Sequence, residues 1–252
     1  MDTVRQVPAP RPDLYRVSAL DVTAVVLYVA VPLAYGLAAG SLLPLLRQVF
    51  SNPAAATFFL NVLVYLSVGI PAFVAARHVV VRDLRVLATR PWFTLMMVPL
   101  ALIAMVIFTS ILVSLAGSLE GSVNQQRIQS LMLQVPAWLM VPLLVVVGPF
   151  VEEYLFRHLL IGKLSQRINI WVCCALSVVV FAAIHVVGRE DLRLNVLLPY
   201  LGMGAALVFV YVWTGRNLMF SYFVHAAKNL LAVVVFYAIP PELMEQFQQL
   251  RP

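Results

Sequence analysis

The chain has 252 residues, of which 62% are hydrophobic and only 11% are charged. A typical soluble domain is roughly 45–50% apolar and about 25% charged, so a water-soluble fold of this length would expose too much apolar surface. The formal net charge of +6 is not concentrated in a long basic cluster. These features exclude a cytosolic enzyme, a disordered regulator and a nucleic-acid-binding protein, and they predict an integral membrane protein.

Seven apolar segments are each long enough for a membrane-spanning helix, which needs about 20 mostly apolar residues. They predict an all-α, polytopic transmembrane helical bundle of about seven spans. A short interfacial helix in the loop Gly117–Val135 would bring the number of helices to eight. In chain order the predicted spans are Val22–Leu46, Pro53–Ala76, Pro91–Leu119, Pro136–Leu164, Ile168–Gly188, Leu194–Gly215 and Asn217–Pro241.

The segments divide the chain into four parts. Residues 1–19 form a leader, residues 20–135 a scaffold of three spans, residues 136–241 a core of four spans, and residues 242–252 a tail. With the N-terminus in the cytoplasm, the inner segments carry 11 Lys and Arg residues and the outer segments carry 5. Four of the inner charges lie in the predicted loop between spans two and three. The positive-inside rule therefore predicts a multi-pass protein with a cytoplasmic N-terminus and an external C-terminus.

Ionisable side chains inside the spans are confined to the C-terminal half. They occur in the sequences VEEYLFRH, VFAAIHVV and FVHAAKNL, whereas the first three predicted spans contain none. A charged residue at the centre of a span costs about 2.5–3.5 kcal/mol on insertion scales, and such residues usually mark function. This asymmetry predicts a catalytic or transport core after residue 136.

The first motif contains two adjacent glutamates with different helical neighbours. Glu153 and Arg157 are four residues apart, so they share a helix face and can form an ion pair. Glu152 lies about 140° away from Arg157 around the helix and is expected to point elsewhere. Pro149 lacks an N–H group and is expected to kink this helix near Glu152.

The second and third motifs each present a polar face as well. Phe181 and His185 are four residues apart, and so are His225 and Asn229. Taken singly, these residues are compatible with a packed core histidine and with interhelical hydrogen bonding. Lys228 is interpreted as snorkelling or pairing with a carboxylate, without a chemical role. Each of three spans places polar side chains inside the membrane at a cost in free energy. One shared site explains all three better than three unrelated roles.

The three motifs resemble those of a known family. EEYLFR matches Glu-Glu-x-x-x-Arg, FAAIH matches Phe-x-x-x-His, and HAAKN matches His-x-x-x-Asn. Their order across three membrane helices is similar to that of the CPBP intramembrane proteases. This group is also called the CAAX-protease and bacteriocin-processing or Abi family, and its best-known type is the Ras-converting CAAX endopeptidase. The resemblance covers roughly residues 136–240.

The resemblance implies an endopeptidase that cleaves a membrane-associated protein or peptide within or at the bilayer. It implies that Glu152 and His185 activate a water molecule. It also implies that His225 and Asn229 stabilise the oxyanion. Peptide hydrolysis needs such a base and such donors. The expected structural or orienting partners are Glu153, Arg157 and Phe181.

Two histidines and a glutamate also resemble a catalytic zinc site, which has three protein ligands and an open position. In that alternative the ligands are Glu152, His185 and His225. The sequence lacks the HExxH helix signature of zinc proteases. We therefore expect a glutamate-type enzyme without a cofactor, with a Zn²⁺ enzyme as the alternative.

Two further function classes use the same residues. A transporter would use them as an ion or proton relay, and it would be expected to show inverted repeats. None is visible in the sequence, because the polar residues all fall in one half. The other class is a non-catalytic scaffold or immunity protein, which the complete set of motifs disfavours.

Overall fold

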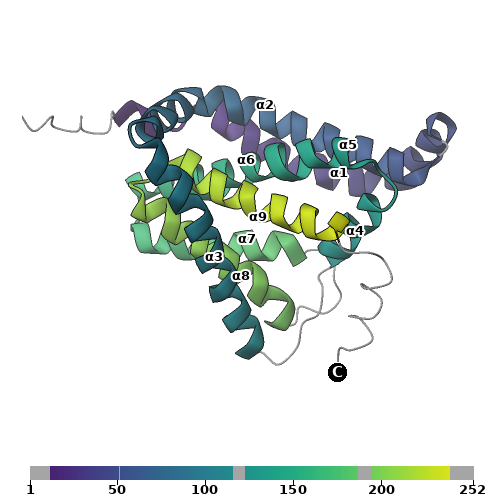
Figure 1. The fold of residues 1–252 in the computed structure, drawn as a ribbon. Helices are drawn as coiled ribbons and strands as arrows, with labels where there is room; N and C mark the ends of the chain where they lie inside the picture. The colour runs from purple at the N-terminus through teal and green to yellow at the C-terminus, as the bar shows by residue number, and fades with distance from the viewer. Residues whose placement is uncertain (1–11, 51, 116–122, 187–193, 239–252) are drawn as a thin grey trace, which may run out of the picture.

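The computed structural model describes residues 12–50, 52–115, 123–186 and 194–238. Most of the predicted leader, residues 1–11, and the predicted tail 242–252 lie outside this range. The described residues form nine α-helices and contain no strand, which confirms the predicted all-α bundle (Figure 1). The helices are α1 (Ala19–Val49), α2 (Pro53–Ala88), α3 (Pro91–Leu115), α4 (Val123–Met132), α5 (Ala137–Val141), α6 (Gly148–Glu153), α7 (Ile170–Val186), α8 (Leu194–Trp213) and α9 (Leu218–Ala238).

Six helical segments among the described residues are long and apolar enough to cross a membrane. The seventh predicted span corresponds to α7, which is a shorter apolar helix of 17 residues. Each predicted span therefore coincides with an apolar helix, and the chain is an integral, multi-pass membrane protein. The short helix expected between residues 117 and 135 is α4.

Helix α2 extends 12 residues beyond the predicted end of the second span at Ala76. The prediction of a loop carrying Arg77, Arg82 and Arg85 was therefore wrong, because these arginines lie on the last turns of a helix. The chain contains no glycine or proline between residues 72 and 90 that would end the helix. Buried residues also continue along α2 as far as Asp83, so tertiary packing supports its final turns.

The central element is a continuous helical segment from Ala137 to Gln166. It is α-helical in α5 and α6 but π-helical over Pro142–Val147 and Tyr154–Lys163, here called the first and second π segments. In its most apolar window 56% of the residues are buried, compared with 11% in each of the first three spans. The predicted irregularity at Pro149 thus takes the form of π-helical turns on both sides of α6.

The other helices surround this central segment. Helix α1 packs along α2, α3 packs against α8 and α9, and α7 packs against α8 and the second π segment. Figure 1 shows α6 and α9 side by side beneath α2, and residues of α6 contact both helices. The three motif-bearing helices therefore meet in one region.

A buried ion pair joins the N-terminal helices to the core. Lys163 Nζ donates to Asp21 Oδ2 at 2.5 Å, and the Tyr154 hydroxyl donates to the other carboxylate oxygen. Ser18 and Asp21 also form a capping box at the start of α1. The expectation that the first three spans lack ionisable groups was wrong, because the first span begins three residues earlier than predicted and so includes Asp21.

A second buried acid, Asp83, fixes the start of α9. Its carboxylate accepts a hydrogen bond of 2.6 Å from the backbone N–H of Leu218 and forms an ion pair of 2.6 Å with Arg82. Asn217 caps the same helix by accepting from the N–H of Phe220 at 2.8 Å. Helix α2 therefore sets the position at which α9 enters the bundle.

Replacing Asp21 by asparagine should destabilise the protein strongly, because Lys163 would remain buried without its counter-charge. Removing one partner of a buried ion pair costs about 3–5 kcal/mol. Thermal unfolding in detergent micelles should show a clearly lower midpoint for Asp21→Asn than for the wild type. Thr23→Ala, a change on the exposed side of α1, is the control and should leave the midpoint nearly unchanged. Equal midpoints for the two variants would contradict this role of Asp21.

Candidate active site

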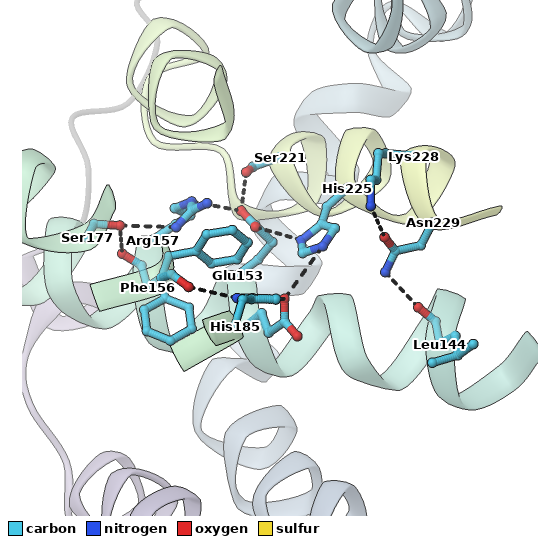
Figure 2. Close-up of polar contacts among 12 residues, drawn as sticks. Leu144, Glu153, Phe156, Arg157, Ser177, His185, Ser221, His225, Lys228 and Asn229 are labelled. Carbon is cyan, nitrogen blue, oxygen red and sulfur yellow. Dashed lines mark hydrogen bonds and ion pairs between the residues drawn. The ribbon is translucent and has the colours of Figure 1, made fainter. Parts of the chain in front are cut away.

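Glu153 is a fully buried acid at the centre of a polar network. Its side chain has no exposed surface and forms an ion pair with Arg157, with Oε2 3.4 Å from Nε. Ser221 Oγ donates to Oε2, and Nδ1 of His225 lies 3.0 Å from Oε1. Figure 2 shows these side chains converging on Glu153 from the central helix and from α9. Glu153 therefore holds α9 against the central helix.

Arg157 is fixed on its other side by α7. Its Nη1 donates to Ser177 Oγ at 3.1 Å, and Ser177 in turn donates to the carbonyl of Phe156 at 2.7 Å. The guanidinium carbon lies 4.8 Å from the centre of the Phe181 ring, a cation–π distance. Phe181 is thus packed against the buried cation, and α7 is joined to the same polar network.

Glu152 points away from this network, as its helical angle predicted. Its Oε2 lies 3.7 Å from His185 Nε2 and 3.6 Å from His225 Nε2. Its side chain retains 12% of its exposed surface, whereas that of Glu153 has none. The two adjacent glutamates therefore occupy different environments, one enclosed by partners and one facing open space.

The orientation of His185 is set by two neighbours. Nδ1 lies 2.7 Å from the carbonyl of Phe181, and because a carbonyl can only accept, Nδ1 carries the proton. In the neutral ring Nε2 is then an acceptor directed towards Glu152. The ring also stacks on Tyr200 of α8, with centroids 4.7 Å apart. Sequence reasoning missed Tyr200, which belongs to none of the three motifs.

Asn229 lies one turn beyond His225 on α9. Its Nδ2 donates to the carbonyl of Leu144 at 2.9 Å. In the first π segment the N–H of Gly148 bonds to the carbonyl five residues earlier, that of Leu143. In this register the donor for Leu144 would be Pro149, which has no N–H group. The proline therefore leaves one carbonyl free, and Asn229 binds it.

A cavity of about 290 Å³ joins these groups. Its polar lining includes both histidines, Glu152 and Asn229, which the sequence predicted to lie together. Part of its wall comes from outside the predicted core. These additional lining residues include Tyr28 on α1, Asn61 and Tyr65 on α2, and Ile128, Gln129 and Met132 on α4.

Two residues that the motifs did not identify are the serines of the buried network. Ser177 and Ser221 each lie four residues before a motif residue, Phe181 and His225, on the same helix face. This spacing was the available signal, but single serines in apolar spans carry little information. The hydroxyl group of Ser221 donates its hydrogen bond to Glu153.

The described residues contain no group of three or more His, Cys, Asp or Glu side chains arranged to hold a metal ion. The two histidine Nε2 atoms face one Glu152 oxygen. The alternative in which Glu152, His185 and His225 bind Zn²⁺ stays a prediction, as does the glutamate-type alternative without a cofactor.

Comparison with known proteins supports the resemblance drawn from the motifs. Residues 134–231 match a family model described as "Type II CAAX prenyl endopeptidase Rce1-like". The chain is 27% identical over 159 residues to "Membrane-embedded CAAX protease MroQ" of Staphylococcus aureus (strain USA300), which covers 62% of this chain and 61% of the relative. It is 32% identical over 129 residues to "Putative membrane peptidase YdiL" of Bacillus subtilis (strain 168), covering 48% and 49%.

These alignments span less than two thirds of the length of either relative. No solved structure matches the chain. The family model lies over the central helix, α7, α8 and most of α9. It therefore includes every motif residue of the site and leaves out α1 to α4.

The different environments of the two glutamates predict different stability effects. Glu153→Gln should lower the free energy of unfolding by about 3–5 kcal/mol, because it leaves Arg157 buried without a counter-charge. Glu152→Gln, at the adjacent position facing the cavity, should change it by less than about 1 kcal/mol. Denaturation followed by circular dichroism in detergent micelles measures both. Similar losses for the two variants would show that Glu153 is not the structural member of the pair.

Proposed function

We propose, from the premise that residues 134–231 belong to the Rce1-like CAAX protease family, that this chain is an intramembrane endopeptidase. Its substrate is a membrane-associated protein or peptide, of which it hydrolyses one peptide bond. The observation that carries the proposal is the convergence of Glu152, His185 and His225 on one cavity inside an apolar helix bundle. A cavity with polar groups inside a bundle supplies both a place for the peptide and the groups that react with it.

In the proposed mechanism Glu152 and His185 activate a water molecule. Two atoms 3.7 Å apart can both contact one water at about 2.8 Å. The Glu152 carboxylate and His185 Nε2 are both acceptors, so one water satisfies them by donating a hydrogen to each. Glu152 then takes a proton as the water oxygen attacks the carbonyl carbon, and it delivers that proton to the leaving amine.

His225 and Asn229 stabilise the oxyanion in this proposal. The Nδ1 atom of His225 is directed to Glu153, so Nε2 donates only when both ring nitrogens are protonated. Asn229 uses one N–H of its amide for Leu144 and retains a second. One donor of this kind is worth about 2.7–4 kcal/mol of transition-state stabilisation. Glu153, with Arg157 behind it, orients His225.

We also propose that the N-terminus is cytoplasmic. The segments assigned to the inner side by their positive charges meet at one end of the bundle. Arg82 donates to Tyr15 and to the carbonyl of Arg216, and Lys163 contacts Asp21. This grouping supports the positive-inside assignment, since segments distant in the sequence share one face.

Substitution of the proposed water-activating pair should abolish cleavage without unfolding the protein. Glu152→Gln and His185→Ala should each lose at least about 100-fold in kcat/KM, the lower range for general acid–base catalysis. Asn229→Ala should lose about 10²–10³-fold. Mass spectrometry of new protein termini in cells expressing each variant measures the loss.

His78→Ala is the matched control for these variants, because His78 is an exposed histidine on α2 outside the cavity. It should release the same termini as the wild type. Retained cleavage by Glu152→Gln or His185→Ala, with the variant folded, would refute the assigned roles.

We propose a glutamate-type mechanism, so a metal chelator should leave activity intact. The purified wild-type protein should keep at least about 80% of its cleavage rate after prolonged treatment with EDTA and removal of the chelate. Added Zn²⁺ should not increase the rate. Loss of activity in EDTA with recovery on addition of Zn²⁺ would overturn this part of the proposal.

A further inference from the structure

Lys228 is a cation within the wall of the catalytic cavity that the mechanism above does not use. It lies on α9, three residues after His225, and lines the cavity beside Asn229. Its Nζ donates to Asn229 Oδ1 at 3.4 Å (Figure 2). A lysine inside a membrane span costs about 2.5–3.5 kcal/mol on insertion scales, so its retention at this position calls for a counter-charge or a ligand.

Of the two glutamates, only Glu152 lines the cavity together with Lys228. Glu153 is enclosed by Arg157, Ser221 and His225, and Glu152 faces the two histidines. Among the side chains that the structure describes, none forms an ion pair with Lys228 within 4.0 Å. Among the described residues its Nζ donates to Asn229 alone, so N–H groups of the ammonium are available to a ligand in the cavity.

Apart from Lys228 itself, Glu152 and the two histidines, the residues that line the cavity are neutral. The amides of Asn61 and Gln129 contribute to the wall, together with apolar side chains of α4, the first π segment and α9. These apolar residues include Met132, Leu144, Val233 and Phe236. An anionic group that enters this region meets a single positive charge in poorly solvated surroundings, where charge-assisted hydrogen bonds are strong.

We propose that Lys228 binds a carboxylate of the substrate and thereby selects the peptide bond that is cleaved. The proposal rests on the proposed protease function and identifies its substrate class. Three residues of helix correspond to about 4.5 Å of rise, and an extended peptide advances about 3.3 Å per residue. The carboxylate therefore lies within a few residues of the scissile bond. It comes either from an Asp or Glu side chain or from the C-terminus of the substrate.

The test uses the purified full-length protein in detergent micelles and a library of apolar peptides. Each peptide is made in matched forms, with a free or an amidated C-terminus and with Asp or Glu replaced by Asn or Gln. Mass spectrometry gives kcat/KM for each form. We expect the wild type to prefer the carboxylate form by at least about 10-fold, because a site that binds a charged group rejects analogues that lack it.

The variants separate direct binding from a general effect of charge. Lys228→Gln should reduce the preference to near unity, Lys228→Arg should retain it, and Lys228→Glu should favour the neutral form. Arg127→Gln removes the same charge from an exposed position on α4 and should keep the wild-type preference. An electrostatic influence of Lys228 on Glu152 alone would change all rates together and leave the ratio between forms unchanged.

The outcomes distinguish the two sources of the carboxylate. They also test the role of Lys228 separately from the protease function. Loss of cleavage on amidation alone assigns the carboxylate to the chain terminus, and loss on Asn or Gln replacement alone assigns it to a side chain. A wild type that cleaves peptides without any carboxylate preference, or a Lys228→Gln variant that keeps the preference, overturns the role of Lys228 only. A wild type that cleaves no peptide and releases no termini in cells overturns the protease function and this inference with it.

Discussion

The buried ion pair between Glu153 and Arg157 constrains the packing of the whole core. Both side chains are fully buried, and removing two charges from water costs several kcal/mol unless further hydrogen bonds surround them. Those bonds come from Ser221 and His225 on α9 and from Ser177 on α7. The three helices that bear the motifs are therefore joined through this pair, and this arrangement places His225 beside the cavity.

The same constraint separates the roles of two neighbouring glutamates. A helix turns by about 100° per residue, so Glu152 points away from Arg157 and Ser221, which contact Glu153. It faces the cavity, where the Nε2 atoms of His185 and His225 approach one of its oxygens. An ionisable group that is held in place but retains open space beside it is suited to proton transfer. In the proposed mechanism the enclosed Glu153 therefore positions His225 beside Glu152.

Much of this arrangement could be predicted from the sequence, since apolar runs located the spans and i,i+4 spacing identified the Glu153–Arg157 pair. Other features could not. The π segments change the hydrogen-bond register of the backbone without changing the pattern of apolar residues. In the sequence, only Pro149 indicated that a backbone carbonyl would lack its N–H partner, and Asn229 binds that carbonyl, which belongs to Leu144. The end of α2 was mistaken for a loop because its arginines suggested solvent exposure. Asp21 lies just before the first apolar run, and its partner Lys163 lies 142 residues later.

The cavity is not confined to the predicted core, because residues of the predicted scaffold line part of its wall. The region that matches the family model, residues 134–231, carries all the motif residues of the cavity, but Asn61 and Gln129 contribute to the cavity wall from outside it. Buried contacts of Asp21 and Asp83 hold α1 and α2 against that region. Relatives that share the motifs but differ in the N-terminal helices would therefore keep the chemistry and change the shape and polarity of the cavity. If the proposed protease function holds, both halves of the chain shape substrate choice, since Lys228 supplies a charge and the N-terminal helices supply part of the cavity wall.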